Sequence, residues 1–197
     1  MAGNAKGCNN ALIVTLGTGV GGGAFLNGEI YAGSNYAGLE VGHIVIEKDG
    51  RLCNCGRKGC FERYAAASAL TRDTQAAMKE HPESALWKIC PDIEKVNAKT
   101  AFDGQKQGDK VATDVVNTYI EYLACGLVNL INIFQPEVVC LGGGVSNERQ
   151  YLLDLLQPHI DREDFARNAR ERTKIVIAKF RNDAGIIGAA MVGVNND

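Results

Sequence analysis

A short apolar strand that runs into clustered glycines, and from there into a hairpin, constrains the fold of this chain more than any other feature. Residues 11–16 (ALIVTL) are β-branched and apolar, as in a buried strand. Asn27-Gly28, a strong signal for a two-residue hairpin turn, follows the glycines of residues 17–23. Fourteen of the 23 glycines lie in the first 60 residues. This clustering predicts tight turns, or backbone that approaches a ligand closely.

The glycine segment is not a dinucleotide-binding turn, although residues 17–22 match G-x-G-x-x-G. In that motif the glycines open a helix whose N-terminus holds a pyrophosphate, whereas here they lead into a hairpin. No G-K-[ST] follows, which excludes a P-loop. A plain glycine-rich turn remains one interpretation. The other is a turn whose N–H groups bind phosphate, with Thr18 as an added donor, which resembles the phosphate hairpins of the actin, hexokinase and sugar-kinase fold.

A second motif, H-x9-C-x-C-x4-C, is formed by His43, Cys53, Cys55 and Cys60. Three thiolates and one imidazole make a complete tetrahedral set for Zn²⁺, so the metal would be structural, with no position open for a catalytic water. Three unrelated thiols beside a core histidine are the alternative. The total of seven cysteines is odd and no export signal is visible, so we expect no disulfide framework and a cytoplasmic protein.

Charge and hydropathy exclude two classes of partner. The net charge of −2 gives no electrostatic footprint for nucleic acid. The most basic stretch, residues 162–174, holds five basic against three acidic residues and suggests a solvated helix face. The longest apolar stretch, residues 119–134, is interrupted by Glu121, Gly126, Asn129 and Asn132, so no membrane span is expected.

Hydrophobic periodicity predicts an α/β fold in which helices pack on a mixed sheet. Asp109 can cap a long helix that Pro136 ends, and Asn147 can cap a later one. The stretch between residues 80 and 100 reads as irregular. Besides the first strand and the hairpin, the expected elements are strands at 43–47, 138–141 and 174–178 and helices at 61–78, 109–134, 147–156 and 183–192.

Four blocks of this chain together resemble the ROK family (repressor, open reading frame, kinase). They are residues 15–23, 40–43, 53–62 (CNCGRKGCFE) and 141–145. The resemblance implies a ribonuclease H-like fold, as in actin, hexokinases and sugar kinases, with a zinc-binding loop. It also implies that residues 1–197 are the C-terminal lobe of a ROK-type sugar kinase, the N-terminal lobe being missing from this chain.

The resemblance assigns a role to each matching residue. Carboxylates and imidazole suit a sugar because they accept hydroxyl protons, and one nitrogen of His43 can bind the metal while the other faces the sugar. For Glu40 and Glu62, ordinary surface charge and a favourable acid at a helix N-terminus stay possible. Leu39 departs from the family, which has glycine there. The implied set is Gly17, Thr18 and Gly19 for phosphate; Gly142, Gly143 and Gly144 near the adenosine; Glu40, His43 and Glu62 for sugar; and His43, Cys53, Cys55 and Cys60 for zinc.

The implied activity is ATP-dependent phosphorylation of a hexose, as in a glucokinase, with Mg²⁺ as cofactor and a homodimer or homo-oligomer as the assembly. The family's first phosphate loop and its catalytic aspartate are expected before Met1. No catalytic residue is therefore assigned, and the chain alone is expected to be inactive. One alternative is the sugar-sensing domain of a ROK-type repressor, and another is a zinc-stabilised binding or dimerisation module without chemistry.

Overall fold

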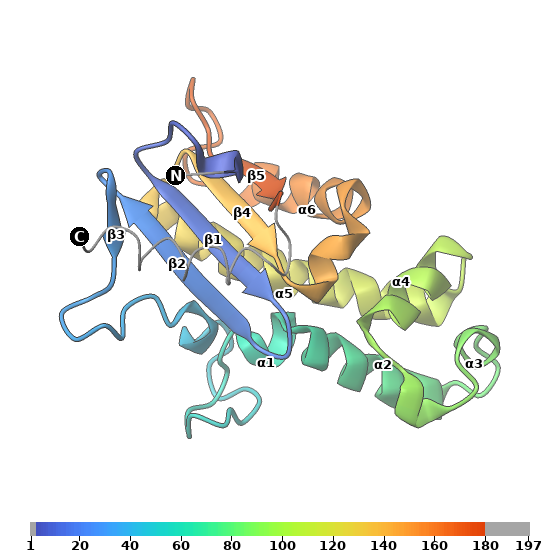
Figure 1. The fold of residues 1–197 in the computed structure, drawn as a ribbon. Coiled ribbons are helices and arrows are strands. Elements are labelled where there is room, and N and C mark those ends of the chain that lie inside the picture. The colour runs from blue at the N-terminus through green and yellow to red at the C-terminus, as the bar shows by residue number, and fades with distance from the viewer. Residues whose placement is uncertain (1–2, 180–197) are drawn as a thin grey trace.

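A computed structural model describes residues 3–179, and a five-stranded mixed sheet lies at its centre (Figure 1). The sheet order is β3-β2-β1-β4-β5, with antiparallel pairing on one side of β1 and parallel pairing on the other. This confirms the mixed α/β architecture. The strands are β1 (Ala11–Leu16), β2 (Val20–Leu26), β3 (Glu29–Tyr31), β4 (Val138–Gly142) and β5 (Lys174–Ile177).

The strands follow their sequence patterns. β4 is buried along its whole length, as its apolar residues predict for a strand with neighbours on both sides. β2 and β3 are joined by the expected two-residue turn, in which Asn27 and Gly28 have φ values of 52° and 84°. The strand predicted at 174–178 is β5, so the predicted strands at both ends of the described chain are confirmed.

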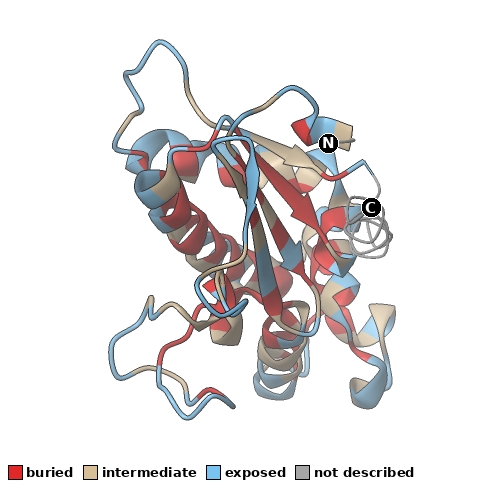
Figure 2. Ribbon diagram, turned by 60° about the vertical axis from the view of Figure 1, so that its left-hand side comes forward, coloured by how far each residue is buried: buried red, intermediate tan, exposed pale blue. Residues whose placement is uncertain are grey.

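Helices cover one face of the sheet and form the main core with it (Figure 2). The long helix α5 buries Leu123, Leu127 and Leu130 against that face, whereas a smaller cluster with Ala5 and Cys140 lies on the other. The helices are α1 (Glu62–Ala65), α2 (Ala67–Glu80), α3 (Leu86–Ile89), α4 (Ala98–Lys106), α5 (Lys110–Phe134) and α6 (Gln150–Glu163), with 3-10 turns η1 (Gly3–Ala5), η2 (Val41–His43), η3 (Ile93–Lys95) and η4 (Gly144–Glu148).

The two ends of α5 confirm the predicted start and stop signals. Asp109 accepts a hydrogen bond from the Ala112 N–H at 2.7 Å, which satisfies a free donor of the first turn. Gln135 ends the helix in the left-handed conformation, and Pro136 follows. None of the helices in residues 3–179 is long and apolar enough to cross a membrane.

Two expected elements between residues 43 and 78 are wrong. The strand predicted at 43–47 is replaced by η2 and a loop, with only one isolated bridge between Val45 and Cys60. The helix predicted at 61–78 is divided at Ala66, whose extended ψ of 158° separates α1 from α2. The loop of residues 44–61, which we call the metal loop, projects from the body of the protein (Figure 1).

Three further expectations need correction. The irregular stretch at 80–100 contains α3 and leads into α4, which begins with a capping box of Asn97 and Thr100. Asn147 lies inside η4 and caps nothing, because α6 begins at Gln150. Residues 164–173 form turns rather than a helix face, with Arg172 paired to Asp161. The helix predicted at 183–192 lies outside the described residues.

Candidate functional site at the carboxyl ends of β1 and β4

The two central parallel strands end at the same edge of the sheet, beside a hollow of about 330 Å³. β1 and β4 are in register there, with Thr15 opposite Gly142. Ligands of open α/β sheets bind outside the carboxyl ends of parallel strands. The hollow is lined by Thr15, Gly17, Thr18, Gly19, Val20, Gly21, Glu40, His43, Glu62 and Gly143.

The glycine turn between β1 and β2 presents unused backbone donors. Within residues 3–179 the N–H groups of Thr18 and Gly19 donate to no other group. The first turn of α2 holds the other side of this turn, since the Ala67 N–H donates to the Gly17 carbonyl at 2.8 Å and the Ser68 hydroxyl to the Thr18 carbonyl at 2.6 Å. Two adjacent free N–H groups beside a hollow are suited to bind an anion.

Gly143 lies across the hollow, directly after β4. Its φ is 82°, and a Cβ atom at this position would lie 2.5 Å from the Leu16 carbonyl oxygen. Only glycine fits such a conformation and such an approach. Gly142 is the last residue of β4 and Gly144 begins η4, so among the three glycines expected near the nucleotide only Gly143 lines the hollow.

Glu40 and His43 enter the hollow from a tight turn before and within η2. The Val41 N–H donates to the Leu39 carbonyl at 2.7 Å around Glu40, whose φ of −69° and ψ of 60° are those of an inverse γ-turn. Leu39 has a φ of 63°, in the left-handed region that favours glycine. The departure noted in the sequence therefore falls on a strained residue next to Glu40.

Glu62 lies between the glycine turn and the metal loop. It begins α1, and its Oε1 atom is 3.2 Å from the Cys53 Sγ atom and 4.0 Å from the His43 Nδ1 atom. Its Oε2 atom lies on the other side, 2.7 Å from where a Cβ atom on Gly19 would be. The Glu62 carboxylate thus lies against both the cysteine cluster and the glycine turn.

The four residues of the cysteine motif converge as a metal site requires. Their ligand atoms all lie within 4.8 Å of one another, with 3.6 Å between the Cys55 and Cys60 sulfurs and 3.6 Å between Cys53 Sγ and His43 Nδ1. Tetrahedral Zn²⁺ with ordinary bond lengths separates two sulfurs by about 3.8 Å and sulfur from nitrogen by about 3.6 Å. A disulfide would require about 2.05 Å. The cluster therefore fits a zinc ion.

Without a metal, these thiols have perturbed acidities. Burial is the main cause that raises the pKa of Cys53 to about 12, and burial also raises the pKa of Cys60. The exposed Cys55 has a lowered pKa, chiefly because it accepts a hydrogen bond from the Arg57 N–H. A bound cation would favour the thiolate at all three positions.

A larger hollow of about 710 Å³ lies elsewhere and contains none of the predicted site residues. It borders the starts of β4 and β5, at the opposite end of these strands. Several polar groups of its wall bond to the protein itself, such as Glu137 to the Asn9 and Asn10 N–H groups and Thr173 to the Pro136 carbonyl. The hollow lined by Glu40, His43 and Glu62 is therefore the better candidate.

Comparison with known proteins identifies the family of this chain. A family model described as the ROK family matches residues 1–195. This chain belongs to the ROK family. Its mixed sheet with helices matches ROK sugar kinase structures, which have the actin-like fold that the family resemblance implies.

Individual ROK proteins show how far the likeness extends. A glucokinase of Thermotoga maritima is 35% identical over 191 residues, which are 96% of this chain and 60% of the relative. A ROK family glucokinase from Streptomyces griseus, solved with glucose and AMPPNP, has a TM-score of 0.87 and 31% identity over 95% of this chain and 61% of that one. The chain thus spans about three fifths of the length of these relatives.

A ROK family regulator has a similar structure. It is described as a transcriptional regulator and a homolog of the E. coli MLC protein, and has a TM-score of 0.80 and 27% identity over 96% of this chain and 47% of that one. Kinases and regulators in this family therefore share the part of the fold that this chain provides.

Sequence reasoning missed four residues of the site, two of which, Val20 and Gly21, line the hollow from the start of β2. Thr15 lines the hollow from the end of β1, and Ser68 binds the glycine turn from α2. Alternation along β1 could have placed Thr15 on the opposite face from Leu16. Nothing in the sequence signals Ser68, because its contact depends on the break at Ala66.

Proposed function

We propose that this chain supplies the sugar-binding residues, the zinc site and part of the nucleotide site of an ATP-dependent hexose kinase of the glucokinase type. One observation carries the proposal: Glu40, His43 and Glu62 line the same hollow as the free N–H groups of the glycine turn and Gly143. The ROK glucokinases described above support a hexose and ATP as the ligands.

In the proposed mechanism, each set of residues orients one reactant. Glu40 and Glu62 accept hydrogen bonds from sugar hydroxyls and so fix the sugar beside the turn. Thr18 and Gly19 donate N–H groups to a phosphate, and Gly143 borders the nucleotide across the hollow. Phosphoryl transfer depends mainly on such positioning and on charge stabilisation, and Mg²⁺ bound with ATP neutralises phosphate charge.

The zinc site has a positioning role in this proposal. His43 Nδ1 faces the three sulfurs, which leaves its Nε2 atom for the sugar. His43 would thus be held in one tautomer and one ring orientation by zinc bound to Cys53, Cys55 and Cys60. A zinc ion held by these four residues would have no position left for a reacting group, so it would serve to orient His43.

Calorimetry with glucose, fructose, N-acetylglucosamine and N-acetylmannosamine tests the sugar site. We expect one of these hexoses to bind, and Glu40→Ala and Glu62→Ala each to weaken its binding by about tenfold or more, since each removes charged hydrogen bonds. Glu121→Ala, an exposed residue on α5, should leave the affinity unchanged. If neither site substitution weakens binding of any hexose, the site assignment is wrong.

The second candidate function is sugar sensing in a ROK-type repressor, favoured by the likeness to the transcriptional regulator. Both functions use the same sugar residues, so hexose affinity does not separate them. The reading frame upstream of Met1 does. An acidic residue followed by Gly-Gly-Thr would support a kinase, and a basic helix-turn-helix would support a repressor.

We also propose that the chain associates with a second copy of itself in the cytoplasm. Several large apolar side chains are exposed, which favours association, and all seven cysteines are unpaired, which suits a reducing compartment. Light scattering that finds a monomer would contradict the assembly. The exposed apolar side chains are those of Ile30, Tyr31, Tyr36, Val45, Leu52, Ile133 and Phe165.

A further inference from the structure

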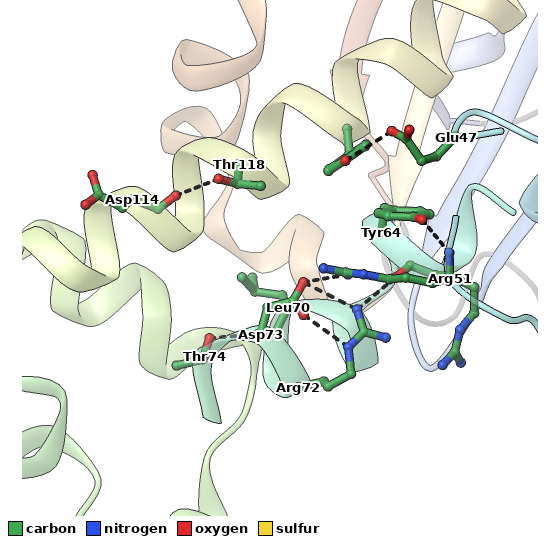
Figure 3. A network of polar contacts seen from close by, with 11 residues as sticks. Glu47, Arg51, Tyr64, Leu70, Arg72, Asp73, Thr74, Asp114 and Thr118 are labelled. Carbon is green, nitrogen blue, oxygen red and sulfur yellow. Dashed lines mark hydrogen bonds and ion pairs between the residues drawn. The ribbon is translucent and has the colours of Figure 1, made fainter. Parts of the chain in front are cut away.

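The metal loop is attached to the helices by a group of side chains that the sugar, nucleotide and zinc assignments do not use. We call this group the base cluster: Glu47 and Arg51 from the loop, Tyr64 from α1, Asp73 from α2 and Tyr122 from α5. Figure 3 shows Arg51 between Tyr64 and Asp73. The cluster therefore joins one projecting loop to three helices.

Arg51 makes the central contacts of the base cluster. Its Nη1 atom donates to Asp73 Oδ2 at 2.9 Å and to the Arg63 carbonyl at 3.2 Å. The guanidinium carbon lies 4.7 Å from the centre of the Tyr64 ring, in cation–π geometry. A planar guanidinium can lie over the ring while its N–H groups donate in their own plane, a geometry that an ammonium group reproduces only in part.

Tyr64 binds the backbone of the metal loop. Its hydroxyl oxygen accepts the Arg51 N–H at 2.7 Å, and a Cβ atom at Gly50 would lie 2.2 Å from the same oxygen, so a side chain at Gly50 would prevent this approach. On its other side the Tyr64 ring packs against Tyr122 at 4.4 Å, and the Tyr122 hydroxyl donates to Glu47 at 3.3 Å. The loop is thus held on an aromatic pair in which Tyr64 is buried and Tyr122 half-buried.

These contacts bear on the sugar site through α1. This helix has only four residues, Glu62 to Ala65, and so short a helix is not stable without tertiary contacts. Tyr64 lies two residues after Glu62, and the Arg63 carbonyl that Arg51 binds lies between them. The attachment of the metal loop to α1 through Tyr64, which Arg51 makes and Arg72 does not, therefore also orients the turn that carries Glu62.

We propose that Arg51 is a positioning residue for Glu62. By holding the metal loop to Tyr64, Arg63 and Asp73, it fixes the direction in which α1 presents the Glu62 carboxylate to the hollow. The proposal rests on the function proposed above, in which Glu62 binds the sugar.

Arg72 provides a matched control. It donates to the same Asp73 carboxylate at 3.0 Å and to the same Arg63 carbonyl at 2.9 Å. It belongs to α2, however, and within residues 3–179 it forms no hydrogen bond or ion pair with the metal loop. Arg72→Ala therefore removes a similar charge and similar bonds without releasing the loop.

A double-mutant cycle on the zinc-loaded 197-residue chain tests the proposal. We expect Arg51→Ala to weaken hexose binding about fivefold or more in the wild-type background, but less than about twofold in the Glu62→Gln background, because it acts through Glu62. Arg72→Ala should change the affinity less than about twofold, and Arg51→Lys should restore only part of it. Zinc content should stay the same throughout.

Equal effects of Arg51→Ala in the two backgrounds would overturn the proposal, because they would mean that Arg51 acts on general stability. If Arg51→Ala does not fold, Arg51→Lys takes its place in the cycle. Hydrogen exchange of residues 62–66 gives a second readout and should be faster in the variant. If Glu62→Gln leaves hexose binding intact, the proposed role of Glu62 in sugar binding is wrong. The proposal for Arg51 is tested separately: unchanged hydrogen exchange of residues 62–66 in the Arg51 variant would show that Arg51 does not position α1.

Discussion

Glu62 shows, at the scale of single residues, why a family resemblance carried by sequence motifs could predict most of this candidate site. Its place in the cysteine block put it next to the metal ligands in sequence, and the structure puts it next to Cys53 and Gly19 in space. Glu40, His43 and the glycine turn line the same hollow. Ser68 could not be predicted in this way, because a backbone break, and not a motif, places it.

Gly143 provides a prediction at this scale. Gly143→Ala should lower the free energy of unfolding by about 2 kcal/mol or more, because the new Cβ would meet the Leu16 carbonyl at a positive φ. Urea denaturation measures the change. Gly144→Ala is the control, since a Cβ there meets nothing within 4 Å and should change stability by less than about 0.5 kcal/mol. Equal stability of the two variants would contradict this account.

At the scale of elements, hydrophobic periodicity predicted the long, capped helix and the buried strands. It failed for segments whose conformation depends on tertiary contacts. α5 and β4 follow their patterns from end to end. Residues 43–47 (HIVIE) contain three adjacent β-branched residues, which favour a strand, but they lie in η2 and the metal loop. Helix α4 was not predicted because it is short and has a glycine, Gly104, in its interior, which weakens the helical pattern.

Asp109 is expected to stabilise α5 and its junction with α3. Besides the Ala112 N–H, it binds the Ala85 N–H at 2.7 Å and the Ser84 hydroxyl at 2.9 Å. Asp109→Ala should therefore cost about 1–2 kcal/mol in chemical denaturation at pH 7. Asp114→Ala, which removes an exposed carboxylate from the same helix, should cost less than about 0.5 kcal/mol.

The cost of Asp109→Ala should depend on pH. Partial burial tends to raise the pKa of Asp109, but hydrogen bonds from Ala112, Ala85 and Ser84 outweigh it and lower the pKa below the ordinary 3.8. A depressed pKa stabilises the fold above the pKa of the unfolded chain, and this contribution is lost as the pH falls. The difference between wild type and variant should thus shrink below about pH 4. A constant difference down to pH 2 would contradict the assigned bonds.

The metal loop should depend on its metal. We expect about one zinc per chain by mass spectrometry, and removal by a chelator should lower the Tm by about 5 °C or more and weaken hexose binding, since His43 loses its anchor. Cys60→Ser should do the same, and Cys90→Ser, outside the cluster, should not. A zinc-free chain with unchanged Tm would rule out a structural metal.

For the whole molecule, the sequence predicted a mixed sheet with helices because the pattern of a hairpin followed by alternating helices and strands admits few other arrangements. It did not predict that the helices of the described chain gather on one face of the sheet (Figure 1). That choice depends on how α2, α4 and α5 pack against one another, which the period of each helix alone does not specify.

The whole-molecule prediction concerns turnover. The resemblance assigns no catalytic base to these 197 residues, so the polypeptide expressed alone should bind a hexose but release no ADP above background in a coupled assay. In a kinase the general base accepts the proton of the attacking hydroxyl, and its loss usually costs about two to four orders of magnitude in rate. Robust turnover by this polypeptide would show that its own residues supply the base.

The position of Glu62, between the cysteine cluster and the hollow, has a practical consequence. His43 and Glu62 adjoin both sites, so a ligand entering the hollow must disturb the surroundings of a metal held by the cysteines. Cobalt accepts the same tetrahedral sulfur and nitrogen ligands as zinc and, unlike zinc, is coloured. Replacing zinc with cobalt would therefore give the protein an optical reporter. Its visible absorption spectrum should change when a sugar binds.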